Sequence, residues 1–340
     1  MARIAVVLTN LGGPDSLQAV EPFLRNLFAD PAIISLPAPL RQLLAWVIAR
    51  RRAAAARAIY EQIGGRSPLR ELTEAQASAL QGRLGDIGDL RVFVAMRHWH
   101  PFARETAAEV AAFAPERVIV VPLYPQYSTT TTASSLADWD RAAMRAGLSA
   151  PRQALCCYPT APGLIAAHVD LIRRGFAEAA EHGKPRVLFS AHGLPQKVVD
   201  GGDPYQWQVE RTAAAIVAGL GLPGLDWRVC YQSRVGPLQW LQPSTEAEIH
   251  RAGADRVPIV VVPIAFVSEH SETLVELDID YRRRANDAGV AAYVRVPALG
   301  THPSFIAALE TMVRHAIRER QPLRSAEGAR LCPAACGRCA

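Results

Sequence analysis

Short apolar runs rich in β-branched residues recur along the chain, and stretches of helical periodicity separate most of them. The first half contains "RIAVVLTN", "RVFVAM" and "RVIVVPLY", and the second half contains "RVLFSA", "WRVCYQS" and "PIVVVPIAFV". These runs show little alternation of apolar and polar residues, which is typical of parallel strands that are covered on both faces. Helical spacing is clear in "ETAAEVAAFA" and "VERTAAAIVAGLG". The pattern predicts an α/β fold of two similar units, with a boundary near residues 150–160.

A polar turn segment follows each of the six predicted strands. These segments are "LGGPDS", "RHWHPF", "PQYSTTTT", "HGLPQK", "RVGPLQW" and "SEHSET". In open α/β sheets, ligands bind outside the carboxyl ends of the strands, so we expect the functional residues in these segments. "LGGP" lacks the spacing of a dinucleotide fingerprint or a P-loop, and its glycines are at least as typical of a plain turn. "STTTTASSL" fits an anion cradle and simple helix capping equally well.

Composition and net charge limit the classes of ligand or partner that we expect. The chain has 340 residues, a net charge of +5 and a pI near 9.0, which suits an anionic ligand, an acidic membrane surface or nucleic acid. No basic run is interleaved with stacking aromatics, so we expect no nucleic-acid partner. "MARIAVVLTN" lacks the long apolar region and cleavage site of a signal peptide, which predicts a cytoplasmic protein. No segment has about 18 uninterrupted apolar residues, so no conventional spanning helix is expected.

The segment 33–59, "IISLPAPLRQLLAWVIARRRAAAARAI", combines large apolar residues with five arginines. This composition is typical of an amphipathic element that lies at a membrane surface. It is equally that of a surface helix whose apolar side packs on the core, and the residues alone favour this second interpretation.

Candidate catalytic groups follow two strands of the second half. His192 lies in "LFSAHGLP", and Glu272, Glu276 and Asp280 are spaced i, i+4, i+8 after "PIVVVPIAFV". On a helix these acids form one stripe that drifts by about 40° per step, and by less if the helix is locally wider. Such a stripe is usually solvated, but acids in the first turn are favoured by the helix dipole. A row of oxygens near an imidazole suits the transfer of a divalent cation or of protons.

In order and spacing, the motifs resemble those of the ferrochelatases. The resemblance covers roughly residues 3–318 and rests on "LTNLGGPDS", "QIGGRSPL", "LYPQYSTTTTASSL", "LFSAHGLP", "GDPY", "YQSRVGPLQWLQP" and "PIAFVSEHSETLVELDIDY". It implies insertion of Fe2+ into protoporphyrin IX by two Rossmann-like domains facing a porphyrin cleft. We expect an N-terminal domain at 1–155 with a pocket lip at about 33–59, a catalytic domain at 156–320, and a cysteine-rich tail at 321–340.

The resemblance also assigns roles to residues. It implies that His192 is the catalytic histidine and that Glu272 is the carboxylate facing it across the porphyrin. His270, which lies on the same loop, is the third predicted catalytic residue. Glu276 and Asp280 match an acidic column on a widened helix, so that His192, Glu272, Glu276 and Asp280 are the predicted metal ligands. Whether His192 acts as base or ligand, and whether the acids move iron or protons, stays open. The implied substrate-binding positions are Leu11, Arg97, Tyr124, Ser128 and Trp240.

Three of the six cysteines lie in the tail "LCPAACGRCA", where Cys332, Cys336 and Cys339 have the spacing of a metal site. Some ferrochelatases hold a [2Fe–2S] cluster with a C-terminal cysteine trio and one upstream cysteine. This trio is spaced differently from the animal pattern, and "LIAAHVDL", where animals place the upstream ligand, has no cysteine. We expect Cys157 as the fourth ligand, with Cys156 as its alternative and Zn2+ as the alternative metal. Cys230 lies inside an apolar strand and is predicted to be a core thiol.

Two alternative functions stay open on the sequence. Coproporphyrin III is the alternative substrate, although the apolar lip favours protoporphyrin IX. A haem- or iron-binding sensor without catalysis is the alternative class, but such a protein is expected to lack His192 or Glu272, and both are present. A homodimer and a peripheral contact with the inner membrane are also compatible with the composition.

Overall fold

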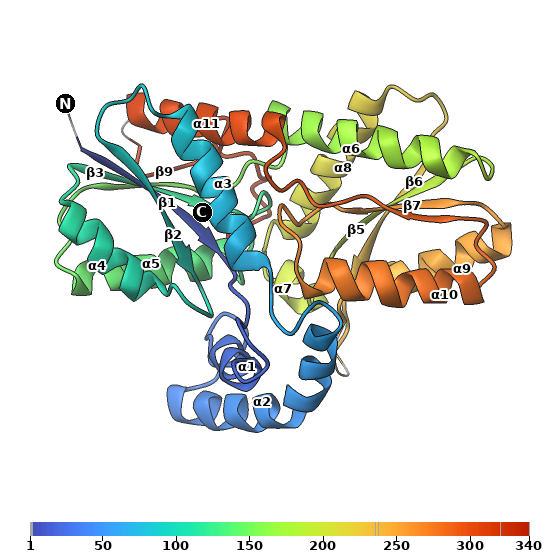
Figure 1. Cartoon of the computed structure of the whole chain (residues 1–340), viewed down its shortest axis with the longest axis horizontal. Helices are drawn as coiled ribbons and strands as arrows, with labels where there is room; N and C mark the ends of the chain where they lie inside the picture. Colours follow the sequence, from blue (N-terminus) through green and yellow to red (C-terminus); the bar gives the residue numbers. More distant parts are fainter. Residues whose placement is uncertain (1–2, 235, 237, 320, 340) are drawn as a thin grey trace. The chain divides into compact units, whose positions relative to one another are not determined.

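The computed structural model describes residues 3–234, 236, 238–319 and 321–339. It divides into two compact units (Figure 1). The first unit consists of Met1–Tyr158 and Leu309–Leu331, and the second consists of Pro159–Ala308 and Cys332–Cys339. The chain passes from the first unit to the second after Tyr158, close to the expected boundary between residues 155 and 156. The C-terminal part differs from the expected ranges, because Leu309–Leu331 joins the first unit and Cys332–Cys339, which holds the three tail cysteines, joins the second.

The described part of the first unit is built on a parallel sheet of five strands. Their order is β2 (Leu90–Met96), β1 (Ile4–Asn10), β3 (Arg117–Pro122), β4 (Arg152–Leu155) and β9 (Leu323–Arg324). Its helices are α1 (Val20–Phe28), α2 (Ala38–Glu61), α3 (Leu69–Arg83), α4 (Ala103–Phe113), α5 (Thr132–Arg145) and the C-terminal part of α11 (Pro303–Arg318). In Figure 1, α3 and α11 lie on one side of this sheet and α4 and α5 on the other.

The second unit repeats this plan around a parallel sheet with four strands among the described residues. Their order is β6 (Asp226–Gln232), β5 (Arg186–His192), β7 (Ile259–Pro263) and β8 (Tyr293–Arg295). The helical segments that belong to it are α6 (Pro162–Ala180), α7 (Gln196–Asp200), α8 (Tyr205–Leu220), α9 (Thr245–Asp255), the π-helix η1 (Glu272–Asp280) and α10 (Tyr281–Asp287).

Strand periodicity explains why both faces of the second sheet are covered. Successive residues of a strand point to opposite faces, so Phe189 and Leu188 of β5 enter different cores. Phe189 packs in a cluster with residues of α6 and α8, and Leu188 packs in a cluster with residues of α9, η1 and α10. Both side chains are fully buried. A strand that is covered on both faces must be apolar at every position, which is the pattern read from the sequence.

The predicted fold class is confirmed, and the structure corrects its details. All six predicted strands are present, but β7 ends at Pro263, whereas the apolar run continues to Val267. Proline has no N–H to donate to a neighbouring strand, and the next residues form a turn. The strands β4, β8 and β9 were not predicted, because they are short edge or near-edge strands whose formation depends on their neighbours.

The segment 33–59 forms most of α2, a long helix that packs on α1 through small residues. Ala45, Ala49 and Ala53 are buried on the α1 side. On the opposite side, large apolar side chains stay exposed, with Leu43 reaching 60%. The described chain contains no helix that is long and apolar enough to cross a bilayer.

Close packing of α9 on the start of the loop after α10 gives a stability prediction. A Cβ added at Gly253 would lie 2.1 Å from the backbone oxygen of Ala288. Backbone cannot move aside cheaply, so Gly253→Ala should destabilise the protein by about 1–3 kcal/mol, as overpacking does. Chemical denaturation followed by circular dichroism measures the loss.

Gly82→Ala in α3 is the matched control for Gly253→Ala. No atom lies within 4 Å of the added Cβ at Gly82, and the position is helical. Alanine is the better helix former, so this variant should gain about 0.5 kcal/mol. Equal effects of the two substitutions would contradict the packing argument.

Candidate active site

The carboxyl ends of β5, β6 and β7 bring three polar segments together in the second unit. His192 is the last residue of β5, Ser233 follows β6, and Glu272 begins η1 in the segment after β7. Because β5 lies between β6 and β7 in the sheet, these segments are neighbours although they are far apart in the sequence. The geometry agrees with the rule that ligands of open α/β sheets bind at this edge.

His192 and Glu272 form a direct pair. The imidazole Nδ1 lies 2.7 Å from the Glu272 carboxylate oxygen Oε2, which is the length of a charge-assisted hydrogen bond. With Nδ1 engaged, Nε2 is the ring nitrogen that can accept a proton or bind a metal ion. Two of the predicted catalytic residues are therefore brought together.

The pair perturbs both pKa values. Burial disfavours the charged imidazolium, but the Glu272 carboxylate outweighs this effect and raises the pKa of His192. Burial also opposes ionisation of Glu272, yet the charge and hydrogen bond of His192 bring the pKa of Glu272 down to about 2. Glu272 is therefore ionised at neutral pH, and it makes His192 a stronger base.

Glu276 lies one step along η1 and behaves differently. Burial and then the charge of Glu272 raise the pKa of Glu276. Its Oε1 accepts hydrogen bonds from the backbone N–H of Ser233 at 2.8 Å and from the Tyr281 hydroxyl at 3.0 Å. Two neighbouring carboxylates are thus held with different proton affinities, an arrangement typical of acid–base sites.

Ser233 was missed as a site residue by sequence reasoning, although "YQSRVGPLQWLQP" was recognised as a motif. Its hydroxyl contacts both Glu272 and Glu276, at 3.1 Å from the Glu272 oxygen. Its backbone has a φ of 61°, a left-handed conformation that non-glycine residues rarely adopt. This conformation directs the N–H and the hydroxyl to the same carboxylate, and no local sequence signal reports it.

The acidic stripe lies on a π-helix, as the widened-helix interpretation expected. The π-helix η1 spans Glu272–Asp280, so residues four apart stay closer to one face than on an α-helix. Asp280 is nevertheless at the end of the helix, with its side chain 40% exposed and 3.2 Å from Arg283. The structure places Glu272 and Glu276 in one hydrogen-bonded network with Ser233, and pairs Asp280 with Arg283 instead.

His270 lies at the entrance of η1. Its Nδ1 accepts the backbone N–H of Glu272 at 3.0 Å, and its ring meets Phe266 edge-on with centroids 4.6 Å apart. Burial lowers the pKa of His270, so its imidazole is neutral at neutral pH. These contacts give His270 a role in fixing the first residue of η1, while its predicted catalytic role stays a prediction.

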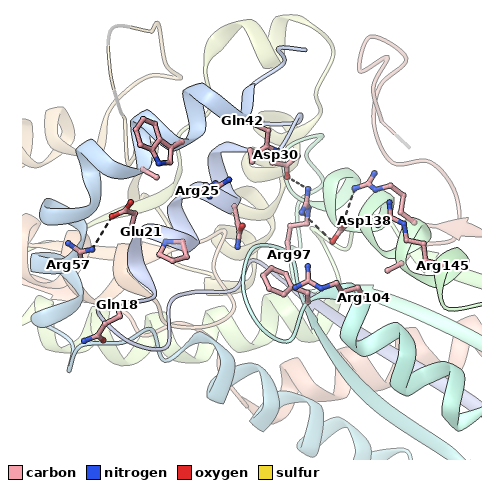
Figure 2. Close-up of a pocket in the computed structure, with 18 residues that line it drawn as sticks. Gln18, Glu21, Arg25, Asp30, Gln42, Arg57, Arg97, Arg104, Asp138 and Arg145 are labelled. Atoms are coloured by element: carbon pink, nitrogen blue, oxygen red, sulfur yellow. Dashed lines mark hydrogen bonds and ion pairs between the residues drawn. The ribbon is translucent and has the colours of Figure 1, made fainter. Parts of the chain in front are cut away.

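Four of the predicted substrate-binding residues lie in the first unit. Leu11 accepts the backbone N–H of His98 at 2.9 Å. Burial raises the pKa of the Tyr124 hydroxyl, and the Ser128 hydroxyl contacts Thr130 at 2.9 Å. Arg97, shown in Figure 2, is bound to two aspartates and lines a cavity.

Trp240 is the fifth predicted substrate-binding residue and lies in the second unit. It forms an isolated antiparallel bridge with Pro195, just after the strand that ends at His192. A Cβ at Gly193 would lie 3.5 Å from its indole ring, and no described residue accepts a hydrogen bond from its buried Nε1. Trp240 therefore packs beside the histidine loop.

The cysteines form close pairs. The sulfurs of Cys332 and Cys339 are 3.1 Å apart, and the sulfurs of Cys156 and Cys157 are 3.2 Å apart. The fully buried Gln208 directs its side-chain N–H at Cys332 Sγ over 3.0 Å, a contact that suits a thiolate. The tail thus has the donor chemistry of a metal site, although no preformed group of three ligating side chains occurs among the residues described. Cys230 is confirmed as a core thiol, because burial raises its pKa to about 12.

Comparison with solved structures identifies the class of fold. SirB from Bacillus subtilis with Fe3+ has a TM-score of 0.54 and 14% identity, covering 92% of this chain and 95% of that chain. The sirohydrochlorin chelatase SirB from Bacillus subtilis subspecies spizizenii, in complex with cobalt, has a TM-score of 0.55 and 12% identity, covering 94% and 97%. At these identities the likeness shows the fold alone. The architecture is that of the chelatases.

The sequence comparisons are more specific than the fold. The model of the ferrochelatase family matches residues 3–317. The ferrochelatase of Phenylobacterium zucineum is 53% identical over 342 aligned positions, covering 99% of this chain and 98% of the relative. The ferrochelatase of Caulobacter vibrioides is 52% identical over 318 positions, covering 93% and 90%. The chain belongs to the ferrochelatase family, which confirms the predicted family and the enzyme class, a lyase.

The His192–Glu272 pair gives a prediction about protonation. Glu272→Gln removes the charge that raises the pKa of His192, while burial of the ring stays, so the pKa of His192 should fall. Titration of the His192 ring by NMR measures the shift. Glu276→Gln removes a weaker influence and should lower this pKa less. An unchanged His192 pKa in Glu272→Gln would show that the pair does not form in solution.

Proposed function

We propose that this ferrochelatase inserts Fe2+ into protoporphyrin IX, forms protohaem and releases two protons, as the last step of haem synthesis. The observation that carries the proposal is the His192–Glu272 pair at the carboxyl ends of β5 and β7, within a chain of the ferrochelatase family. Sequence identity near 50% over most of the chain supports the reaction class.

Metal insertion needs a proton acceptor beside the ring. Two pyrrole N–H protons leave as the metal enters, and a flat macrocycle hides its lone pairs from the metal. Bending the ring exposes them, at the expense of binding energy from the rest of the macrocycle. A base that is held in one orientation within hydrogen-bonding reach of the ring then removes the protons.

His192 meets these requirements. Glu272 holds Nδ1, which directs Nε2 outward as the proton acceptor and raises the pKa of the imidazole. Glu276, whose pKa is raised, is suited to take the proton onward through the Ser233 hydroxyl, which contacts both carboxylates. These features support a proton-relay role for Glu276, and for Glu272 the role of orienting the base. The metal-ligand roles of His192, Glu272, Glu276 and Asp280 stay predictions.

Replacing the histidine tests the proposed base. His192→Ala should lower the rate of metalloporphyrin formation by about 10²–10⁴-fold, the usual contribution of a positioned base. The measurement is anaerobic incubation with Fe2+ and protoporphyrin IX, followed by absorbance. His250→Ala, which removes an exposed histidine of α9, is the control and should keep normal turnover. Normal turnover in His192→Ala would refute the assignment.

The same assay has an expected pH dependence. A base must be neutral to accept a proton, so the rate should rise with pH through the raised pKa of His192. In Glu272→Gln the rising limb should move to lower pH, because the pKa of His192 falls, and the maximal rate should decrease because the imidazole is less well oriented. If the rate rises over the same pH range in both enzymes, the group that titrates is not His192.

The choice of porphyrin is supported by α2. Leu40, Leu43 and Leu44 are exposed apolar residues of the predicted lip, and they favour protoporphyrin IX over coproporphyrin III, which has more propionates. Parallel assays with the two porphyrins decide between them. Product from neither porphyrin would favour the alternative class, a haem- or iron-binding sensor.

We also propose that Cys332, Cys336, Cys339 and Cys157 hold a [2Fe–2S] cluster, with Cys156 as the alternative fourth ligand and Zn2+ as the alternative metal. The close Cys332–Cys339 sulfurs and the Gln208 contact support thiolate ligation. When bound, the cluster supplies a covalent link that fixes the tail. The protein contributes by holding Cys332 beside α8.

The tail has its own test. The purified protein should show visible absorbance of the cluster, and Cys332→Ser should lose it together with bound iron and sulfide. Cys230→Ala, which removes a core thiol in the second unit, should keep the absorbance. A colourless sample that contains zinc would replace the cluster with the zinc alternative.

The exposed side of α2 supports a peripheral contact with the inner membrane by a cytoplasmic protein. Leu40, Leu43 and Trp46 are exposed on the same helix as Arg50 and Arg51, which is the composition of an interfacial helix. The homodimer stays a prediction.

A further inference from the structure

A cavity of about 740 Å³ lies within the first unit. Its lining residues do not include His192, Glu272 or Glu276. Its walls come from α1 and α2 on one side, and from α5 and the segment between β2 and α4 on the other (Figure 2). The volume is in the range of small-molecule sites. Two earlier predictions meet at this cavity, since Arg97 was predicted to bind substrate and Trp46 belongs to the predicted lip at 33–59. The other charged residues that line the cavity outside this lip have no role assigned so far.

Charge is the main property of the cavity. It is lined by three carboxylates, those of Glu21, Asp30 and Asp138, and by six arginines, which are Arg25, Arg57, Arg97, Arg104, Arg141 and Arg145. Three positive charges are therefore in excess. Like charges that face a common space repel one another unless an anion lies between them. The excess of positive charge therefore favours an anion over a cation as the ligand.

The floor of the cavity is rigid. Arg97 is only 13% exposed, and its Nη2 lies 2.8 Å from Oδ2 of the buried Asp30. Its Nε donates to the Ser134 hydroxyl over 2.7 Å, and its Nη1 lies 3.7 Å from Asp138. Asp30 is itself 1% exposed and fixed by the backbone N–H of Ala32 at 2.9 Å. These bonds hold one guanidinium in place before any ligand binds.

Each carboxylate of the cavity already has an arginine. Asp30 binds Arg97, while Glu21 lies 3.7 Å from Arg57 and Asp138 lies 3.1 Å from Arg141. Of the other three arginines, Arg104 lies 3.6 Å from Glu105. The remaining two, Arg25 from α1 and Arg145 from α5, reach the cavity from opposite sides (Figure 2). In the described part of the chain neither of them forms an ion pair.

We propose that this cavity binds a small anion that carries at least two carboxylate or phosphate groups, held between Arg25 and Arg145. A guanidinium presents a planar fork of donors that matches the oxygens of both groups, so two arginines on opposite walls suit a ligand with an anionic group at each end. The inference concerns a site separate from the proposed catalytic residues and does not depend on metal insertion.

Isothermal titration calorimetry with the whole protein tests the site, using inorganic pyrophosphate and citrate as separate probes. At least one probe should bind at low ionic strength, and added salt should weaken it. Arg25→Gln and Arg145→Gln should each weaken binding about tenfold, and the double variant about a hundredfold, since each removes one charge-assisted contact. A preference between the probes shows whether phosphate or carboxylate is the better ligand.

Arg174→Gln is the matched control, because it removes the same charge from an exposed side chain of α6 outside the cavity. It should bind the probe as the parent protein does. Both cavity arginines are exposed, so the variants should fold, which thermal melting verifies. The proposal is overturned if neither probe binds, if Arg174→Gln weakens binding as much as Arg145→Gln, or if only vesicles of anionic lipid bind.

Discussion

The hydrogen bond between His192 and Glu272 is the interaction on which the candidate active site depends. It joins the end of β5 to the start of η1, two positions that lie 80 residues apart in the chain. The bond forms because β5 and β7 are neighbours in a parallel sheet, so that both strands end at one edge. The bond engages Nδ1 of His192 and leaves Nε2 as the other ring nitrogen. It also raises the pKa of His192 and keeps the Glu272 carboxylate ionised.

A second carboxylate makes this pair into an acid–base network, and its position rests on two irregular features of the backbone. The π-helix keeps Glu276 near the face that Glu272 occupies, and the left-handed Ser233 directs two donors toward both acids. The left-handed conformation of Ser233 costs about 1–3 kcal/mol, and such conformations persist when the packing of the surrounding structure fixes them. Buried Val275 and Leu277 on the other side of η1 supply such packing.

The first unit uses the same sheet architecture for a different kind of chemistry. Its polar centre is the Asp30–Arg97 ion pair, which ties the end of α1 to the end of β2 and is continued to α5 by Ser134. Arginines surround this pair on the side that opens to the cavity. The second unit therefore has carboxylates around a histidine, whereas the first has arginines around a carboxylate. The two units share a sheet architecture but carry opposite charges in their polar centres.

The sequence alone determined the repeated strand and helix pattern, the segments at the strand ends, and the residue types His192, Glu272 and Glu276 as candidates. These are local properties, because strand and helix periodicity are set within a few residues. Only the tertiary structure decided that Ser233 joins the two acids, that Asp280 pairs with Arg283 instead, and that Arg25 and Arg145 line one cavity. These facts depend on strand order and on side-chain contacts between distant segments, which no local pattern encodes.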